Sequence, residues 1–223
     1  MHLVGYKFLD EHCTRRSADV LKMNKGERPH DFIKRCEKHG YVAQDPRNVV
    51  DHYKFLSDEL IQGDLEAKRH PNLYLMCINI INDFNVAAIQ RCSNCFGVNK
   101  VYIFGNKNYD RRGACGAYKY IHLEHIKDLN EFNNIKNNFD IIVSLENCAG
   151  SKSINEYTWD YTKNTLIIVG QESIGIPGEF IDMSDALLEI RMRGSIRSLN
   201  VSQAATVALF DYDSKFNNLL ITS

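Results

Sequence analysis

Short apolar segments that alternate with helical segments constrain the fold of this chain most strongly. Short, continuously apolar segments are typical of buried strands in a parallel sheet that has helices on both faces. The helical segments expected between and after them cover 86–97, 124–138 and 200–212. The sequence therefore predicts an α/β fold with a mostly parallel sheet, and the expected strands are 73–80, 101–105, 140–146, 165–170 and 186–192.

Residues 1–72 differ from the rest because their apolar segments are short and their charges are many. The spacing of Val49, Tyr53, Leu56 and Leu60 predicts an amphipathic helix over 48–68, before Pro71. Residues 1–40 hold nine lysines and arginines against six aspartates and glutamates, which fits either a solvated helical face or an arm that contacts RNA. The predicted organisation is a largely helical N-terminal region over 1–72, a globular domain over 73–213 and a short tail over 214–223.

Composition excludes several protein classes. A hydrophobic fraction of 44% and a net charge of -1 exclude a disordered chain and argue against indiscriminate binding of polyanions. No apolar segment reaches the ~18 residues of a membrane span, and the N-terminus lacks the pattern of a signal peptide. Seven cysteines, an odd number, fit reduced thiols better than a disulfide framework. We expect a cytoplasmic protein, with a nuclear or organellar location left open.

Polar residues follow the expected strands, and ligands of parallel sheets gather beyond the carboxyl ends of strands. Asn85 follows the first strand and is expected to cap the helix that begins there. Arg91 lies six residues later in an otherwise apolar helix, so its guanidinium must either pair with an acid or face a polar cleft.

Two later segments carry further candidates. In GQESIGIP (170–177), two glycines and a proline allow a tight backbone path, and Glu172 can cap amides or accept from a ligand hydroxyl. In 190–202, Arg191, Arg193 and Arg197 surround a glycine, and arginine forks suit the oxygens of an anionic ligand. Ser198 or Ser202 is expected to cap the final helix.

The Cys92–Cys95 pair has the CxxC spacing of redox and zinc sites. A structural zinc ion needs four ligands, and His122, His125 and Cys115 share no recognised spacing with the pair. We therefore expect the two thiols to be small core residues and predict no metal site.

Together, three segments resemble the motifs of the SpoU (TrmH-type) branch of the SPOUT RNA methyltransferases. The motifs appear as NVAAIQRCSNCFGV (85–98), IIVGQESIGIP (167–177) and IRMRGSIRSLNVSQAA (190–205), and the resemblance covers about residues 73–212. Two residues depart from the family pattern: Gln171 stands where Asn is common, and Arg191 replaces the usual Pro.

The resemblance implies a C-terminal deep trefoil knot, a homodimer and the cofactor S-adenosylmethionine. It implies methylation of a ribose 2'-hydroxyl in tRNA or rRNA. Because an arginine is effectively always protonated, we expect Arg91 to position the substrate and not to act as a base. By residue, the resemblance implies cofactor contacts at Leu145, Gly170, Ile190 and Leu199, and catalytic or positioning roles for Asn85, Arg91, Glu172, Ser198 and Asn200. Arg111, Arg112, Arg193 and Arg197 are expected to meet RNA phosphates.

Two other functions remain as alternatives. One is an RNA-binding protein that has the same knotted fold but no longer catalyses methyl transfer, which the two departures allow. The other is a redox or metal protein that uses the CxxC pair. Methyl transfer to RNA distinguishes the enzyme from the first alternative, and thiol titration with a metal assay tests the second.

Overall fold

The computed structural model describes residues 5–8, 24, 27–39, 41–45, 47–106, 109–171 and 173–222. The chain divides into two compact units, Met1–Asp64 and Leu65–Ser223. Within the described residues, no helix is long and apolar enough to cross a membrane.

The smaller unit contains a strand pair as well as helices. Strand β1 (Gly5–Phe8) pairs antiparallel with β2 (Tyr41–Gln44), and helix α1 (Pro29–Lys38) buries Phe32 and Cys36. The prediction of a largely helical region over 1–72 is therefore wrong in this part of the chain.

The expected positive charge of this unit is partly neutralised by ion pairs. Arg28 pairs with Asp31 at 2.8 Å, and Arg35 pairs with Glu27 at 2.8 Å. The side chains of residues 1–23, where most of the other cations of this region occur, lie outside the described residues.

The helix expected over 48–68 is interrupted. A 3-10 turn, η1 (Asp51–Tyr53), is followed by helix α2 (Asp58–Glu66), and Phe55 between them has a φ of 67° that no helix continues through. The buried face also differs from the prediction, because Ile61 is buried whereas Leu60 is 62% exposed.

The larger unit is built on a seven-stranded sheet in which every strand pair is parallel. Its strand order is β5-β4-β3-β8-β6-β9-β7. The predicted α/β fold with a mostly parallel sheet is confirmed. The strands are β3 (His70–Ile78), β4 (Val98–Phe104), β5 (His122–Ile126), β6 (Ile141–Leu145), β7 (Lys152–Ser153), β8 (Thr165–Val169) and β9 (Ala186–Glu189).

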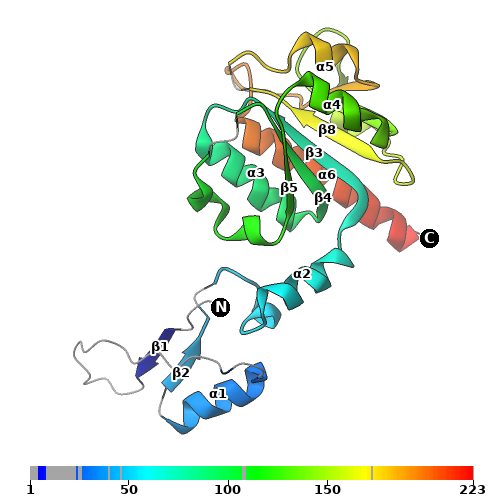
Figure 1. Ribbon diagram of the computed structural model, residues 1–223. Helices are drawn as coiled ribbons and strands as arrows, with labels where there is room; N and C mark the ends of the chain where they lie inside the picture. The colour runs from blue at the N-terminus through cyan, green and yellow to red at the C-terminus, as the bar shows by residue number, and fades with distance from the viewer. Residues whose placement is uncertain are drawn as a thin grey trace. The chain divides into compact units, whose positions relative to one another are not determined.

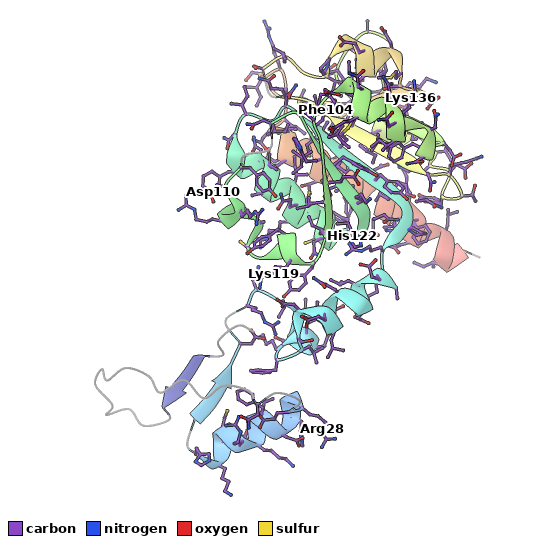
Figure 2. All side chains as sticks on the ribbon, in the orientation of Figure 1. Arg28, Phe104, Asp110, Lys119, His122 and Lys136 are labelled. Atoms are coloured by element: carbon purple, nitrogen blue, oxygen red, sulfur yellow. The ribbon has the colours of Figure 1, made fainter. Side chains whose placement is uncertain are left out.

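Helices cover both faces of this sheet (Figure 1). Helices α3 (Asp83–Cys95) and α6 (Val201–Thr222) lie on one face, where Ile89 and Leu209 join one buried cluster. Helices α4 (Leu129–Ile135) and α5 (Gly178–Asp182) lie on the other face. There Phe104 of β4, labelled in Figure 2, packs against Phe180 with ring centroids 5.0 Å apart. Burial of each such side chain contributes about 1.5–3 kcal/mol.

Two helix predictions need correction in this unit. The segment 124–138 is not one helix, because 122–126 form the edge strand β5 and Asp128 then caps α4 through the N–H groups of Asn130 and Glu131. The final helix continues well past residue 212, so residues 214–222 are helical and not a separate tail.

Polar contacts fasten the C-terminal helix to an earlier segment of the chain. The Lys215 ammonium donates to the carbonyl oxygens of Ile154 at 2.9 Å, Asn155 at 3.2 Å and Tyr157 at 2.9 Å. It also pairs with Asp211 at 2.8 Å, and the same carboxylate accepts from the Trp159 indole at 2.8 Å. We call this group of contacts the Lys215 clasp.

Candidate active site

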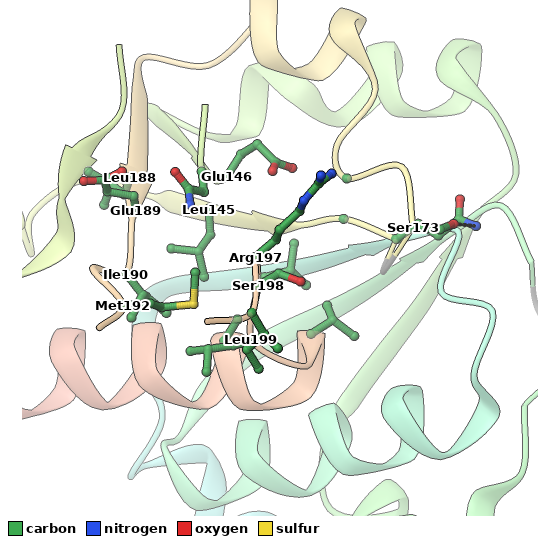
Figure 3. A pocket seen from close by; sticks show the side chains of 18 of the residues that line it. Leu145, Glu146, Ser173, Leu188, Glu189, Ile190, Met192, Arg197, Ser198 and Leu199 are labelled. Atoms are coloured by element: carbon green, nitrogen blue, oxygen red, sulfur yellow. Dashed lines mark hydrogen bonds between the residues drawn. The ribbon is translucent and has the colours of Figure 1, made fainter. Parts of the chain in front are cut away.

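A cavity of about 940 Å³ lies at the carboxyl ends of β6, β8 and β9. Its walls come from the segment that follows each of these strands and from the first turn of α6 (Figure 3). The cavity therefore lies at the edge of the sheet where ligands of parallel sheets collect. Its volume falls within the ordinary range for small-molecule sites.

All four residues predicted to contact a cofactor line this cavity. They are Leu145 at the end of β6, Gly170 after β8, and Ile190 and Leu199 after β9. Gly170 is sterically required, since a Cβ at this position would lie 2.4 Å from the Gly175 carbonyl carbon.

The loop that follows β8 is closed by a backbone bridge. The Gln171 N–H donates to the Gly175 carbonyl oxygen at 3.1 Å, and the Gly175 N–H donates to the Gln171 carbonyl oxygen at 2.8 Å. The departing residue Gln171 also donates from its side chain to Ser173 Oγ at 3.2 Å, so it fits the closed loop. Glu172 lies outside the described residues.

Glu146 is a cavity residue for which we predicted no role. It follows β6 directly, and its carboxylate accepts from the Ile176 N–H at 2.9 Å. An acidic side chain immediately after a buried parallel strand is the signal that points to it. Figure 3 shows the side chains of Glu146 and Arg197 extending toward the loop after β8.

Asn85 and Asn200, which are 115 residues apart in the chain, meet beside the cavity. Asn85 is buried in the first turn of α3, and its side-chain oxygen accepts from Asn200 Nδ2 at 3.0 Å. Asn200 Oδ1 accepts from the Ser202 N–H at 2.9 Å, so it caps α6. The amide pair thus links the N-terminal ends of α3 and α6.

Two predictions of helix-capping residues are wrong. Asn82 caps α3 by accepting from the Phe84 N–H at 3.0 Å, so Asn85 is not the cap. Neither Ser198 nor Ser202 caps α6, because the Asn200 side chain makes the capping contact; Ser198 instead lines the cavity.

We expect Asn85→Ala to lower the free energy of unfolding by about 1–3 kcal/mol, because Asn200 Nδ2 loses its acceptor. Asn200→Ala removes the helix cap as well, so its loss is larger by about 1 kcal/mol. Urea unfolding of both variants and of the double variant measures the coupling. Losses that simply add in the double variant would mean that the pair makes no contribution of its own.

Arg91 takes neither of the two environments expected for it. Its side chain is exposed on α3, and Nη1 lies 3.5 Å from the Cys115 sulfur. None of the hydrogen bonds and ion pairs recorded for the described residues joins Arg91 to an acid or to Asn85, Ser198 or Asn200. The guanidinium is therefore available to a ligand from solvent.

The arginines predicted to meet RNA fall into two groups. Arg197 lines the cavity and Arg193 is exposed in the same segment. Arg111 and Arg112 lie on η2 (Arg111–Ala114), which packs against α3 and follows Asp110, labelled in Figure 2. The Arg112 Nε donates to Asp110 at 2.7 Å, and Arg111 lies over the Tyr118 ring at 5.5 Å.

The second departing residue, Arg191, forms ion pairs at the cavity wall. Strand β9 ends at Glu189, not at the expected residue 192, and Arg191 lies in the loop that follows. Its guanidinium is 3.3 Å from Glu156 and 3.6 Å from Glu189. Arg191 thus makes exposed ion pairs at the position where the family pattern has a proline.

The CxxC pair does not form a redox centre of the usual kind. Cys92 packs against the core, and burial raises the pKa of its thiol to about 11. Cys95 is exposed, so the prediction that both thiols are core residues is wrong for Cys95. In the part of the chain that the structure describes, no group of three or more His, Cys, Asp or Glu residues could hold a metal ion.

Comparison with known proteins identifies the family to which this sheet and cavity belong. The sequence model of the SpoU rRNA Methylase family matches residues 72–210, which hold the whole sheet except the first two residues of β3. The chain belongs to this family. The three motifs quoted above lie inside the matched segment, as the resemblance implied.

Named relatives in the family are RNA methyltransferases. A tRNA (guanosine(18)-2'-O)-methyltransferase from Aquifex aeolicus is 31% identical over 152 residues, which span 65% of this chain and 70% of that enzyme. A 23S rRNA (guanosine-2'-O-)-methyltransferase from Coxiella burnetii is 26% identical over 78% of this chain and 70% of its own length.

Solved structures agree with the fold. The A. aeolicus TrmH/SpoU tRNA modifying enzyme has a TM-score of 0.62 and 26% identity over 71% of this chain and 85% of its own. The SpoU methyltransferase AviRb from Streptomyces viridochromogenes, solved in complex with AdoMet, has a TM-score of 0.58 over 79% of this chain and 64% of its own, but at 19% identity supports the fold alone.

Proposed function

We propose that this chain transfers a methyl group from S-adenosylmethionine to a ribose 2'-hydroxyl of tRNA or rRNA. The observation that carries this proposal is the cavity, whose walls come mostly from the second and third family motifs. The amide pair of Asn85 and Asn200 brings the first motif to its edge.

The cavity residues fit S-adenosylmethionine. The side chains of Leu145, Ile190 and Leu199 supply apolar walls for an aromatic base, and the missing Cβ of Gly170 allows close approach to the backbone. When bound, the cofactor supplies a methyl group on a positively charged sulfur.

The chain's own polar residues position the accepting ribose. Arg91 is permanently charged, so it grips a phosphate or orients the hydroxyl, and the hydroxyl proton leaves to solvent or phosphate. Asn85, Ser198 and Asn200 provide neutral hydrogen bonds that fix the geometry, and Glu172 accepts from a ligand hydroxyl.

RNA contacts extend outward from the cavity. Arg193 and Arg197 meet phosphates at its mouth, and Arg111 and Arg112 extend the basic surface along η2. The unit Met1–Asp64 is the proposed site of substrate recognition, because the family match begins only at residue 72.

The decisive experiment incubates the purified protein with methyl-labelled S-adenosylmethionine and either total tRNA or rRNA. We expect label in one RNA class, in a nucleotide whose linkage resists alkaline hydrolysis because its 2'-hydroxyl is blocked. A chain lacking residues 1–64 is expected to keep cofactor affinity and lose RNA affinity. Cofactor binding without transfer to either RNA would contradict an enzymatic function.

An inactive RNA-binding protein is the alternative with the same fold. Both departing residues make contacts within the fold: Gln171 donates to Ser173, and Arg191 pairs with Glu156 and Glu189. Nothing in the geometry favours this alternative over the enzyme.

A homodimer with a trefoil knot is part of the proposal. Large apolar side chains are exposed at Val207 and Phe210 on α6, at Phe84 on α3 and at Ile81 just before it, and a second copy would cover them. The later strands β8 and β9 lie between earlier strands, as a threaded chain requires.

We expect Phe210→Glu, which places a charge in this apolar surface, to convert a dimer into a monomer. Sedimentation equilibrium measures the mass of both forms, and Asn217→Glu, an exposed change on the same helix, is the control. A wild-type monomer would contradict the proposed dimer.

A further inference from the structure

We propose that Glu146 is a positioning residue that holds the loop after β8 in the shape that binds the cofactor. The inference rests on the proposed function for the identity of the ligand, S-adenosylmethionine. Its structural content is one contact, in which the Glu146 carboxylate latches the loop 170–176 to the end of β6.

The backbone fixes the position of Glu146. Its N–H donates to the Leu188 carbonyl oxygen at 2.9 Å, which ties the end of β6 to β9. From there the side chain reaches across the cavity wall, and Oε2 accepts from the Ile176 N–H at 2.9 Å. Ile176 is buried, so without the carboxylate its N–H would have neither this acceptor nor ready access to water.

Gly175 shows that the carboxylate is built into the loop. A Cβ on Gly175 would lie 2.4 Å from Glu146 Oε2, so the carboxylate occupies the space that any other side chain would need. Gly175 also has a φ of 72°, which glycine adopts readily and other residues rarely do.

The contact between Glu146 and Ile176 affects other residues of the loop as well. Gly175 closes the backbone bridge with Gln171, and the bridge brackets Glu172, the residue with a proposed role on this loop. Gly170, a cavity residue, packs directly against Gly175 and Ile176. Release of Ile176 would therefore loosen a wall of the cavity.

Two conservative variants separate this role from a charge effect. Glu146→Gln keeps an oxygen acceptor at the same reach and removes the charge. Glu146→Asp keeps the charge but shortens the side chain by one methylene, so it no longer reaches the Ile176 N–H. A carboxylate that acted on the cationic cofactor by charge alone would give the opposite pattern.

The test measures the Kd of S-adenosylmethionine for the full-length protein by calorimetry, without RNA. Without the contact to Ile176, part of the binding free energy is used to order the loop. We therefore expect Glu146→Ala and Glu146→Asp to weaken the affinity for the cofactor about 10-fold, and Glu146→Gln to weaken it by less than about 3-fold. Glu179→Ala, an exposed acid in the first turn of α5, is the matched control. Weak binding by Gln with normal binding by Asp, or normal binding by Ala, would overturn the proposal.

Amide hydrogen exchange gives a second readout that needs no cofactor. We expect the Ile176 amide to exchange faster in the Ala and Asp variants than in the wild type and the Gln variant. If Glu146→Ala does not fold, the Asp and Gln variants decide the question. Failure of the wild type to bind the cofactor would contradict the proposed function, while unchanged exchange at Ile176 in the Asp variant would contradict the latch.

Discussion

We expect Arg91→Ala to lower the rate of methyl transfer by about 100-fold or more and to leave the affinity for S-adenosylmethionine unchanged. The magnitude follows from the loss of an orienting contact to the substrate. The separation follows from the structure, because Arg91 is exposed on α3 and is not among the residues that line the cavity. Single-turnover transfer to RNA and calorimetric binding of the cofactor measure the two quantities.

Two further variants make the Arg91 prediction specific. Arg91→Lys keeps the charge but not the planar fork, so it is expected to recover only part of the rate. Lys163→Ala removes an exposed cation just before β8, at the end of the strand opposite the cavity, and is expected to have no effect. Near-normal transfer by Arg91→Ala would exclude an essential role for this arginine.

Gly170→Ala is expected to weaken the binding of S-adenosylmethionine about 100-fold or more. The new Cβ would lie 2.4 Å from the Gly175 carbonyl carbon and 2.6 Å from the Ile176 nitrogen. Both are backbone atoms of the closed loop, so they cannot move aside as the end of a flexible side chain can, and the loop must take another shape. Loss of affinity then appears in calorimetry even if the protein remains folded.

Gly178→Ala is the control for this prediction. It adds the same methyl group eight residues later, where nothing lies within 4 Å of the new Cβ. Because alanine favours a helix more than glycine does, this variant is expected to bind normally and to be slightly more stable. Equal affinities of the Gly170→Ala and Gly178→Ala variants would mean that the contact of Gly170 with the loop does not shape the cavity.

The sheet could be predicted because most of its strands are continuously apolar. Buried strands such as β8 show this pattern directly, and the rule for parallel sheets then places ligands beyond their carboxyl ends. Strand β5 does not show this pattern, because it is an edge strand in which only two of the five residues are apolar. It is also followed almost directly by the helical segment after Asp128, so the sequence predicts one helix over both.

Local backbone conformation accounts for most of the other differences. No spacing of apolar residues reveals the positive φ of Phe55, which divides the helix expected over 48–68. Capping residues were misassigned by a few positions because Asn and Ser near a helix start are chemically interchangeable as caps. The pairing of Asn85 with Asn200 needs the tertiary fold, and so does the contact between Glu146 and Gly175.

The Lys215 clasp makes completion of the cavity depend on a late segment of the chain. Lys215 binds carbonyl groups about 60 residues earlier in the chain, and the cavity is walled partly by Val201 and Ala204 of the helix that the clasp anchors. A ribosome adds residues from the N-terminus, so every strand of the seven-stranded sheet is synthesised before this helix. Val201 and Ala204 reach the cavity only when this helix has docked, so we expect the cavity to close after the strands of the sheet have been synthesised.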